Sequence, residues 1–359
     1  MKQTEFSKDG SAYITSKIKE AVTNQSRTAT ISGNWEICEA IRLPSDFTLI
    51  LEEAHLRMAD GVYSNMFVNE HHGTEIGNTV DGTDRNIHII GRKTAILDGG
   101  TYNGLSETTQ LQNGLPPIWK NNLLLFTNVN GFRISGISCR NQRWWAFNFI
   151  YCRNGYLGNL DFCACDIAID ENGNEYRGLI RSKYHEVLVK NADGIDLRQG
   201  CRDILIENIT GFTEDDSVAL TALNGKMERT FAVAELPSDL CRVEIRNVRT
   251  AAFCSNVRLL NQGGIRLYDI TIDGVYDTSR ESSHMDKGIY AVRIGDTRLY
   301  GARHSTADET YNITVKNVCG GGSYVLSLAG AIKNLVYFGL EALEGTKMLK
   351  DERSPSPAS

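Results

Sequence analysis

Short runs of alternating apolar and polar residues recur along most of the chain. Each run is rich in Ile and Val, and many have Asn or Gly near the middle. Alternation of this kind is typical of β-strands with one buried face, because successive side chains point to opposite faces. We therefore expect a β protein built from repeats. The similar runs are 132–139, 156–163, 203–210, 243–250, 265–272, 312–319 and 332–339.

The spacing of these runs indicates a solenoid. Successive runs start 20 to 47 residues apart, which we interpret as one or two units of about 20 to 24 residues. Parallel strands from successive units would stack about 4.8 Å apart. Inward Ile, Val, Leu and Phe would form one core, and Asn would stack at the bends. The LxxLxLxxN pattern of leucine-rich repeats is missing, as are the hairpin signals of a propeller, so an all-β parallel β-helix is predicted.

One helix is expected, at the start of the chain. The segment "SAYITSKIKEAV" places Ile14, Ile18 and Val22 on one helical face. Such a helix would cap the first coil, whose edge would otherwise be open to strand pairing. The expected organisation is a single β-helix domain over 1–350, with a cap region over 1–24, and a Pro- and Ser-rich disordered tail over 351–359.

Composition and charge narrow the classes of partner. The chain has 359 residues, of which 41% are hydrophobic and 23% charged, and a net charge of −6. Nucleic-acid binding would require a clustered basic face, so this balance argues against it. No apolar run reaches the roughly 18 residues of a membrane span. The N-terminus lacks the apolar core of a signal peptide, so we expect a cytoplasmic protein, or a secreted one if this N-terminus has been processed.

The nine cysteines do not suggest a metal site. Cys163 and Cys165 form the only close pair, and no second Cys or His pair stands at a ligand spacing. We interpret the cysteines as reduced thiols that act as small hydrophobic residues. No metal and no cofactor are expected.

Acidic residues gather in the stretch 191–223. Asp215 follows Asp193 by 22 residues, about one repeat, so a solenoid would make them neighbours on one face. Arg258 follows Asp215 by 43 residues, about two repeats. Close carboxylates raise one another's pKa, which lets one hold a proton while another is ionised. Glycoside hydrolysis requires such a pair. The alternative is that these acids only cap bends, which applies most to Asp196.

Several segments resemble the pectinase-like right-handed parallel β-helix proteins, and the polygalacturonases of glycoside hydrolase family 28 in particular. "NADGID" (191–196) resembles the motif N-T-D-G-x-D, and "EDDSVAL" (214–220) resembles Q/G-D-D-C-I-A. "RNIHIIGRKTAILDGG" (85–100) resembles n-I-x-I-x-G…I-D-G-x-G. The segment 121–149 is similar to the coil that carries N-S-P-x-W. The resemblance extends from about residue 10 to about residue 345.

This resemblance implies a glycosidase that cleaves a plant or bacterial oligo- or polysaccharide, pectin-related or built from another acidic or neutral sugar. It implies that Asp215 is the general acid and that Asp193 and Asp216 hold the attacking water. A gap of one coil suggests by itself the shorter spacing of retaining enzymes, whereas the resemblance implies inversion. Arg258 matches the arginine of R-I-K and would bind the sugar. Further substrate-binding candidates are Asn191, Asp196, Trp145, Lys226 and His185.

Two features of that family are missing. There is no G-H-G motif, and 22 residues after Asp215 the chain has Pro237. Leu260 stands where the family has the lysine of R-I-K. Glu235 and Asp239 are candidates to replace the histidine. These differences leave open a different sugar, another β-helix reaction (a lyase, an epimerase or a fructotransferase), or a carbohydrate-binding or adhesive β-helix without catalysis.

Overall fold

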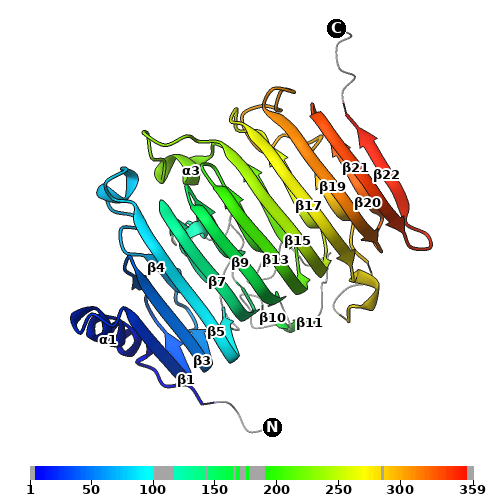
Figure 1. Cartoon of the computed structure of the whole chain (residues 1–359). Coiled ribbons are helices and arrows are strands. Elements are labelled where there is room, and N and C mark those ends of the chain that lie inside the picture. Colours follow the sequence, from blue (N-terminus) through cyan, green and yellow to red (C-terminus); the bar gives the residue numbers. More distant parts are fainter. Residues whose placement is uncertain are drawn as a thin grey trace.

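The protein is a parallel β-helix in the computed structural model, which describes residues 5–100, 117–142, 144–164, 167–169, 175–177, 191–283 and 287–353. Two ten-stranded parallel sheets run the length of the molecule (Figure 1). We call the sheet with the longer strands sheet A and the other one sheet B. Each coil contributes one strand to each sheet. The predicted fold class is therefore confirmed.

The strands of sheet A, in their order across the sheet, are β1 (Thr28–Ile37), β3 (Phe47–Met58), β5 (Asp84–Asp98), β7 (Val129–Arg140), β9 (Arg153–Cys163), β13 (Arg202–Thr213), β15 (Leu240–Ala252), β17 (Leu267–Asp277), β19 (Thr310–Gly320) and β21 (Lys333–Ala342). Those of sheet B are β2 (Ile41–Leu43), β4 (Phe67–Asn69), β6 (Leu124–Thr127), β8 (Trp144–Ile150), β12 (Asn191–Arg198), β14 (Val218–Ala222), β16 (Ser255–Asn261), β18 (Tyr290–Ile294), β20 (Tyr324–Ala329) and β22 (Lys347–Glu352). A separate antiparallel pair is formed by β10 (Ile167–Ile169) and β11 (Glu175–Arg177).

Asparagine turns the corner within the long strands of sheet A. In β13, Ile206 and Ile209 both face the core although they are three residues apart, because Asn208 between them has φ 56° and shifts the alternation by one residue. Asn adopts this left-handed conformation more readily than most residues. Asn208 donates to Asn159 at 3.0 Å and accepts from Asn247 at 2.7 Å. The predicted stacking of Asn at bends is therefore present.

One continuous hydrophobic core fills the coils. Equivalent inward residues lie directly above one another, and burial of each aliphatic side chain contributes about 1.5–3 kcal/mol. At the N-terminal end, helix α1 (Gly10–Thr23) packs Ile14 and Ile18 into this core, so the predicted cap is confirmed (Figure 1). One such stack, fully buried along its length, contains Ile134, Leu157, Ile206, Ile245, Ile272 and Val315.

The interpretation of the longer steps as two repeats is wrong. β9 pairs directly with β13, β13 with β15, and β17 with β19, so steps of 40 and 47 residues are single coils that contain insertions. The stacking register is set by the inward side chains, and a longer loop outside the stack changes it little. Arg258 consequently lies one coil after Asp215 rather than two, with Ala219 of β14 opposite Arg258.

One insertion, residues 223–239, leaves sheet B after β14 and contains a short helix, α3 (Lys226–Thr230). Five residues are too few to show a helical period, so the sequence did not predict it. The other short helices among the described residues are η1 (Ile76–Asn78), η2 (Ile118–Lys120) and η4 (Ser279–Glu281). At the other end, β22 continues to Glu352, past the expected boundary at 350, and 354–359 lie outside the described residues.

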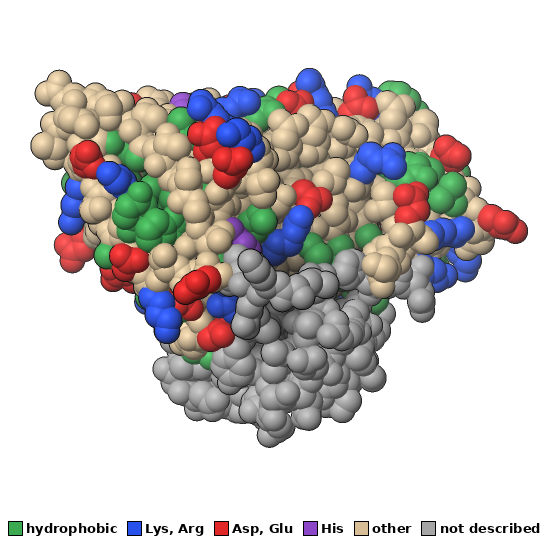
Figure 2. Space-filling view, turned by 90° about the horizontal axis from the view of Figure 1, so that it is seen from below, with side chains coloured by type: hydrophobic (Ala, Val, Ile, Leu, Met, Phe, Trp, Pro, Cys, Tyr) green, Lys and Arg blue, Asp and Glu red, His purple; other side chains and the backbone are tan. Residues whose placement is uncertain are grey.

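The surface carries charges of both signs. On the face shown in Figure 2, acidic and basic side chains are interspersed, as is typical of a solvated surface. Among the described residues, every helix is too short or too polar to span a bilayer.

Candidate active site

Three aspartates from adjacent coils meet where the chain enters sheet B. Asp193 lies near the start of β12, and Asp215 and Asp216 form the bend before β14. The Gly194 N–H donates to the Asp216 carbonyl at 3.0 Å, and the Asp216 N–H donates to Asp193 Oδ1 at 3.1 Å. One carboxylate oxygen from each of the three aspartates can be chosen so that all lie within 4.8 Å of one another. The structure therefore brings together the three residues that the sequence singled out for catalysis.

Asp196 belongs to the same cluster. It is 1% exposed in β12, and Arg198 Nη2 donates to its Oδ1 at 3.2 Å. It is neither a solvated bend residue nor an exposed sugar ligand, because its side chain faces Arg198 and Asp193. We call Asp193, Asp196, Asp215 and Asp216 the acid cluster.

Burial and mutual repulsion raise the pKa of Asp193, Asp196 and Asp215. Burial raises the pKa of Asp193 well above its usual value, and the charges of the other three aspartates add to the effect. The pKa of Asp196 rises to about 7, mainly through burial, with Arg198 opposing. Burial and then the charge of Asp216 raise the pKa of Asp215 to about 6, while a Cys254 hydrogen bond and Arg258 oppose the shift. Asp193, Asp196 and Asp215 therefore bind protons at a higher pH than ordinary aspartates do, and their titrations are coupled.

The raised pKa of Asp193 makes a testable prediction about stability. A carboxyl group whose pKa is higher in the folded state contributes fully to the free energy of unfolding at pH values below its unfolded pKa of about 3.9. This contribution is lost as the pH rises through the folded pKa. Asp193→Asn removes that loss and keeps an oxygen that can accept the Asp216 N–H. We expect the variant to melt several degrees above the wild type at pH 8 and close to it at pH 4, by thermal denaturation.

The matched control is Asp269→Asn, at an exposed corner where Asn312 donates to Asp269 Oδ1 at 2.9 Å. This variant should melt like the wild type at both pH values. Equal shifts for Asp193→Asn at pH 4 and pH 8 would contradict the buried-charge explanation.

Arg258 is fixed beside the acid cluster. Its Nη1 lies 3.5 Å from Asp216 Oδ2, and its Nη2 donates to Asp296 Oδ2 at 2.7 Å. Arg293 from the next coil shares that Asp296 oxygen at 2.5 Å. Burial acts to lower the pKa of Arg258, but the charges of Asp216, Asp215 and Asp296 outweigh burial, so the pKa lies above its usual value. Arg258 thus presents a permanent positive charge next to Asp216, although it is only 7% exposed.

The other residues predicted to bind substrate make fewer contacts with the acid cluster than Arg258 does, or lie outside the described residues. Trp145 pairs with Asp193 in the β-ladder and is half-buried, but the Arg198 guanidinium lies over its ring at 4.3 Å and covers one face. Lys226 is exposed at the start of α3, and among the described residues its ammonium makes no ion pair with the acid cluster. Asn191 begins β12. His185 lies outside the described residues.

Cys254 occupies the position one coil after Asp215. Its N–H donates to the Asp215 carbonyl at 3.3 Å, and its thiol hydrogen-bonds the Asp215 carboxylate. Burial and the nearby acids raise the thiol pKa well above its usual value, so the sulfur keeps its proton. Neither proposed substitute for the histidine lies here, since Glu235 is exposed and Asp239 binds Arg266 at 2.5 Å. Counting 22 residues failed because the 223–239 insertion lengthens this coil.

Sequence reasoning also missed a buried ion pair that supports the acid cluster. Arg198 Nη1 donates to Glu228 Oε1 at 3.0 Å, and Arg198 Nε donates to Asn148 Oδ1 at 3.1 Å. Arg198 and Glu228 are both almost fully buried. Asp196 and Arg198 share a strand face at i and i+2, so the contact between these two residues could have been predicted from the sequence. Nothing in the sequence indicated that Glu228 would meet them.

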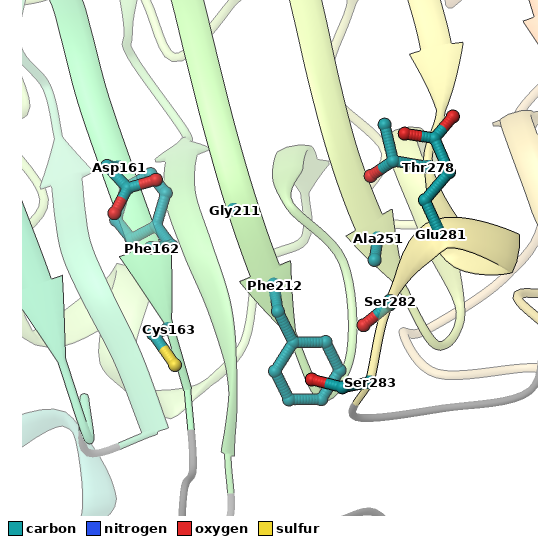
Figure 3. A pocket seen from close by; sticks show the side chains of 10 residues that line it. All are labelled: Asp161, Phe162, Cys163, Gly211, Phe212, Ala251, Thr278, Glu281, Ser282 and Ser283. Carbon is teal, nitrogen blue, oxygen red and sulfur yellow. The ribbon is translucent and has the colours of Figure 1, made fainter.

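A pocket of about 430 Å³ lies elsewhere, at the C-terminal ends of β9, β13 and β15. Figure 3 shows Asp161 and Glu281 on opposite sides of this pocket, with Phe212 between them. Asp161 is already bound to Arg140 and Thr210. None of the four aspartates of the acid cluster lines the pocket, so we do not place the chemistry there.

Oxygen ligands of this type also suit hard divalent cations, and Asp193, Asp215 and Asp216 lie close enough together to hold one. A cation would first have to displace the protons that burial keeps on Asp193 and Asp215. Proton binding and cation binding therefore compete at these carboxyl groups.

Comparison with known proteins shows a likeness in fold. No protein-family model matches the chain, and neither does any curated protein. Among solved structures, an iota-carrageenase of family GH82 from A. fortis has a TM-score of 0.62 at 11% identity, over 99% of this chain and 88% of that one. An exopolygalacturonase from Thermotoga maritima has a TM-score of 0.53 at 13% identity, over 90% and 87%. An endo-xylogalacturonan hydrolase from Aspergillus tubingensis has a TM-score of 0.50 at 15% identity, over 94% and 92%. The chain therefore has a pectinase-like β-helix fold.

Proposed function

We propose that the protein is a glycoside hydrolase that cleaves a glycosidic bond of an oligo- or polysaccharide by acid–base chemistry at the acid cluster. The observation that carries the proposal is the meeting of Asp193, Asp215 and Asp216, from adjacent coils, within 4.8 Å. A shared proton supply next to ionisable carboxylates is what glycoside hydrolysis requires. The fold agrees with this, since the similar solved structures include enzymes named as polysaccharide hydrolases.

Each residue has a role in the proposed reaction. Asp215, the more exposed of the three, donates its proton to the leaving glycosidic oxygen. Asp193 and Asp216, which are more deeply buried, hold a water, and the pair accepts the proton that this water loses as its oxygen bonds to the anomeric carbon. One C–O bond forms, one breaks, and one water is consumed. Arg258 binds the sugar beside the scissile bond.

The proposed stereochemical outcome is inversion, because in the proposed reaction Asp193 and Asp216 hold a water that attacks the anomeric carbon, and neither carboxylate attacks it directly. The short spacing of the oxygens would by itself suit a retaining enzyme. Proton NMR of the first-formed anomer distinguishes the two outcomes.

The pKa of Asp215 predicts a pH profile for the reaction. A general acid works only while it is protonated, so kcat should fall as the pH rises above about 6, the pKa of Asp215. Cys254→Ala removes a hydrogen bond that lowers this pKa, so the alkaline limb should move to higher pH. Initial rates from pH 4 to pH 9 check both points. A profile that stays flat to pH 8 would contradict the role of Asp215.

A screen for reducing ends tests the proposed function. Plant and bacterial polysaccharides are incubated with the wild type, and Asp215→Asn serves as the blank. We expect new reducing ends from the wild type alone on at least one anionic polymer, because Arg258 lies 3.5 Å from Asp216 and the charge of Arg293 also acts on Asp215. Failure on every polymer tested would overturn the proposal.

A lyase is the second candidate, since the same three carboxylates could hold the cation that lyases often use. Its products carry a carbon–carbon double bond and absorb in the ultraviolet, whereas hydrolysis products do not. A carbohydrate-binding or adhesive β-helix would release no reducing ends, and its binding would survive Asp215→Asn.

A further inference from the structure

The outer face of sheet B differs on the two sides of the acid cluster. On the N-terminal side, outward residues of successive strands are almost fully buried, including Val68, Leu125 and Asn148. The 223–239 insertion covers them. Its residues Met227 and Phe231 join Val68 and Leu125 in a small hydrophobic cluster separate from the main core. This side of the face is therefore packed with side chains.

Hydrogen bonds and an ion pair hold the 223–239 insertion against sheet B and η1. Glu228 binds Arg198 of β12, and Asn148 Nδ2 lies 3.6 Å from the sulfur of Met227. Asn78 of η1 donates to the Thr230 carbonyl at 2.9 Å. Met227 and Phe231 are both almost fully buried. The insertion is thus a fixed part of the fold, and a sugar chain would have to break these contacts to lie over β4 to β8.

The C-terminal side presents aromatic rings and cations instead. Tyr290 and Tyr324 lie two and three coils after Asp216, beyond Ser255 of β16. Their rings stack with centroids 5.9 Å apart, and both residues are half-buried. The Arg293 guanidinium lies 5.0 Å from the Tyr290 ring, and the Lys347 ammonium lies 5.6 Å from the Tyr324 ring. Because these contacts occupy faces of the two rings, a sugar would meet the ring edges and hydroxyl groups, and the cations would bind carboxylate or sulfate groups. This surface suits an anionic sugar chain.

We infer that the enzyme acts at the end of an anionic polysaccharide, with the chain extending from the acid cluster over Tyr290 and Tyr324 and the terminal sugars held against the 223–239 insertion. The inference rests on the proposed function and adds the mode of attack and the charge of the substrate. Coils repeat about every 4.8 Å, so Tyr324, three coils from Asp216, contacts only substrates of several sugars.

The first test measures how the polymer is shortened. Homogalacturonan and iota-carrageenan serve as probes, and viscosity and reducing ends are followed together. Attack at chain ends produces many reducing ends before viscosity falls, and short products of one size from the start. An early collapse of viscosity with mixed products would overturn the inference and leave the hydrolase proposal intact.

The second test uses Tyr324→Ala on oligosaccharides of two to eight sugars from both polymers. We expect kcat/KM to fall about tenfold on the longest substrates, the scale of one aromatic contact, and to be unchanged on the shortest. Tyr311→Ala is the matched control, because Tyr311 stacks on Tyr268 at 4.9 Å on sheet A and should change nothing. An equal loss at all lengths, or none, would contradict the binding path. If neither polymer yields reducing ends and Asp215→Asn binds none of the oligosaccharides, while the wider screen finds a neutral substrate, the inferred charge of the substrate is wrong and the hydrolase proposal stands.

Discussion

Asparagine in place of Asp215 is expected to lower kcat by at least about a hundredfold, the usual scale of general acid–base catalysis. The amide has the size of the carboxyl group, and its oxygen can still accept a hydrogen bond from the Cys254 thiol. It cannot donate an acidic proton to the leaving oxygen. The fold should persist, because Asp215 is linked to its neighbours mainly through its backbone carbonyl. Initial rates at pH 5.5 on the substrate found by the reducing-end screen measure the effect.

Asp269→Asn again provides the control, since it makes the same chemical change on the outside of sheet A. It should keep wild-type kcat. If Asp215→Asn retained a rate within a few-fold of wild type while remaining folded, the assignment of the general acid would be wrong.

Glutamine in place of Arg198 is expected to lower the free energy of unfolding by about 3–5 kcal/mol, the cost of leaving a buried charge without its partner. Arg198 neutralises both Asp196 and Glu228, and the exposed fractions of all three are below 5%. The loss should be larger at pH 8 than at pH 5, because protonation at lower pH removes part of the uncompensated charge. Urea denaturation at the two pH values measures it.

Arg242→Gln is the matched control for this change. Arg242 binds Asp203 through two hydrogen bonds of 2.6 and 2.8 Å, but the pair lies on the surface. Surface pairs contribute about 1 kcal/mol or less, so this variant should remain close to wild type. Similar losses for the two variants would show that Arg198 does not neutralise a buried cluster.

The fold was predictable because each coil repeats the same local signals. Alternating Ile and Val fix the inward face, and the residue at the corner must tolerate positive φ, as Asn208 does. The prediction that Asp193 and Asp215 lie in adjacent coils was also correct, because the chain between them forms one coil without a long insertion. Those two features were enough to place three aspartates together.

The rest of the site depends on contacts that a repeat count cannot supply. The 223–239 insertion displaced Cys254 from the counted position, and Glu228 reaches Arg198 only because that insertion folds back onto sheet B. The burial that raises the pKa of Asp196 to about 7 is likewise a property of the packed structure. Residues in register could be predicted from the sequence, whereas residues brought in by loops could not.

The most direct test of a coupled carboxyl cluster is a carbon-13 NMR titration of protein labelled at the aspartate side-chain carboxyl. Ordinary aspartates titrate near 3.9. The structure predicts at least one resonance with a midpoint near pH 6 that disappears in Asp215→Asn. If every aspartate resonance of the folded wild type titrated below pH 5, the carboxyl groups would not share one buried site, and the proposed chemistry would fall with it.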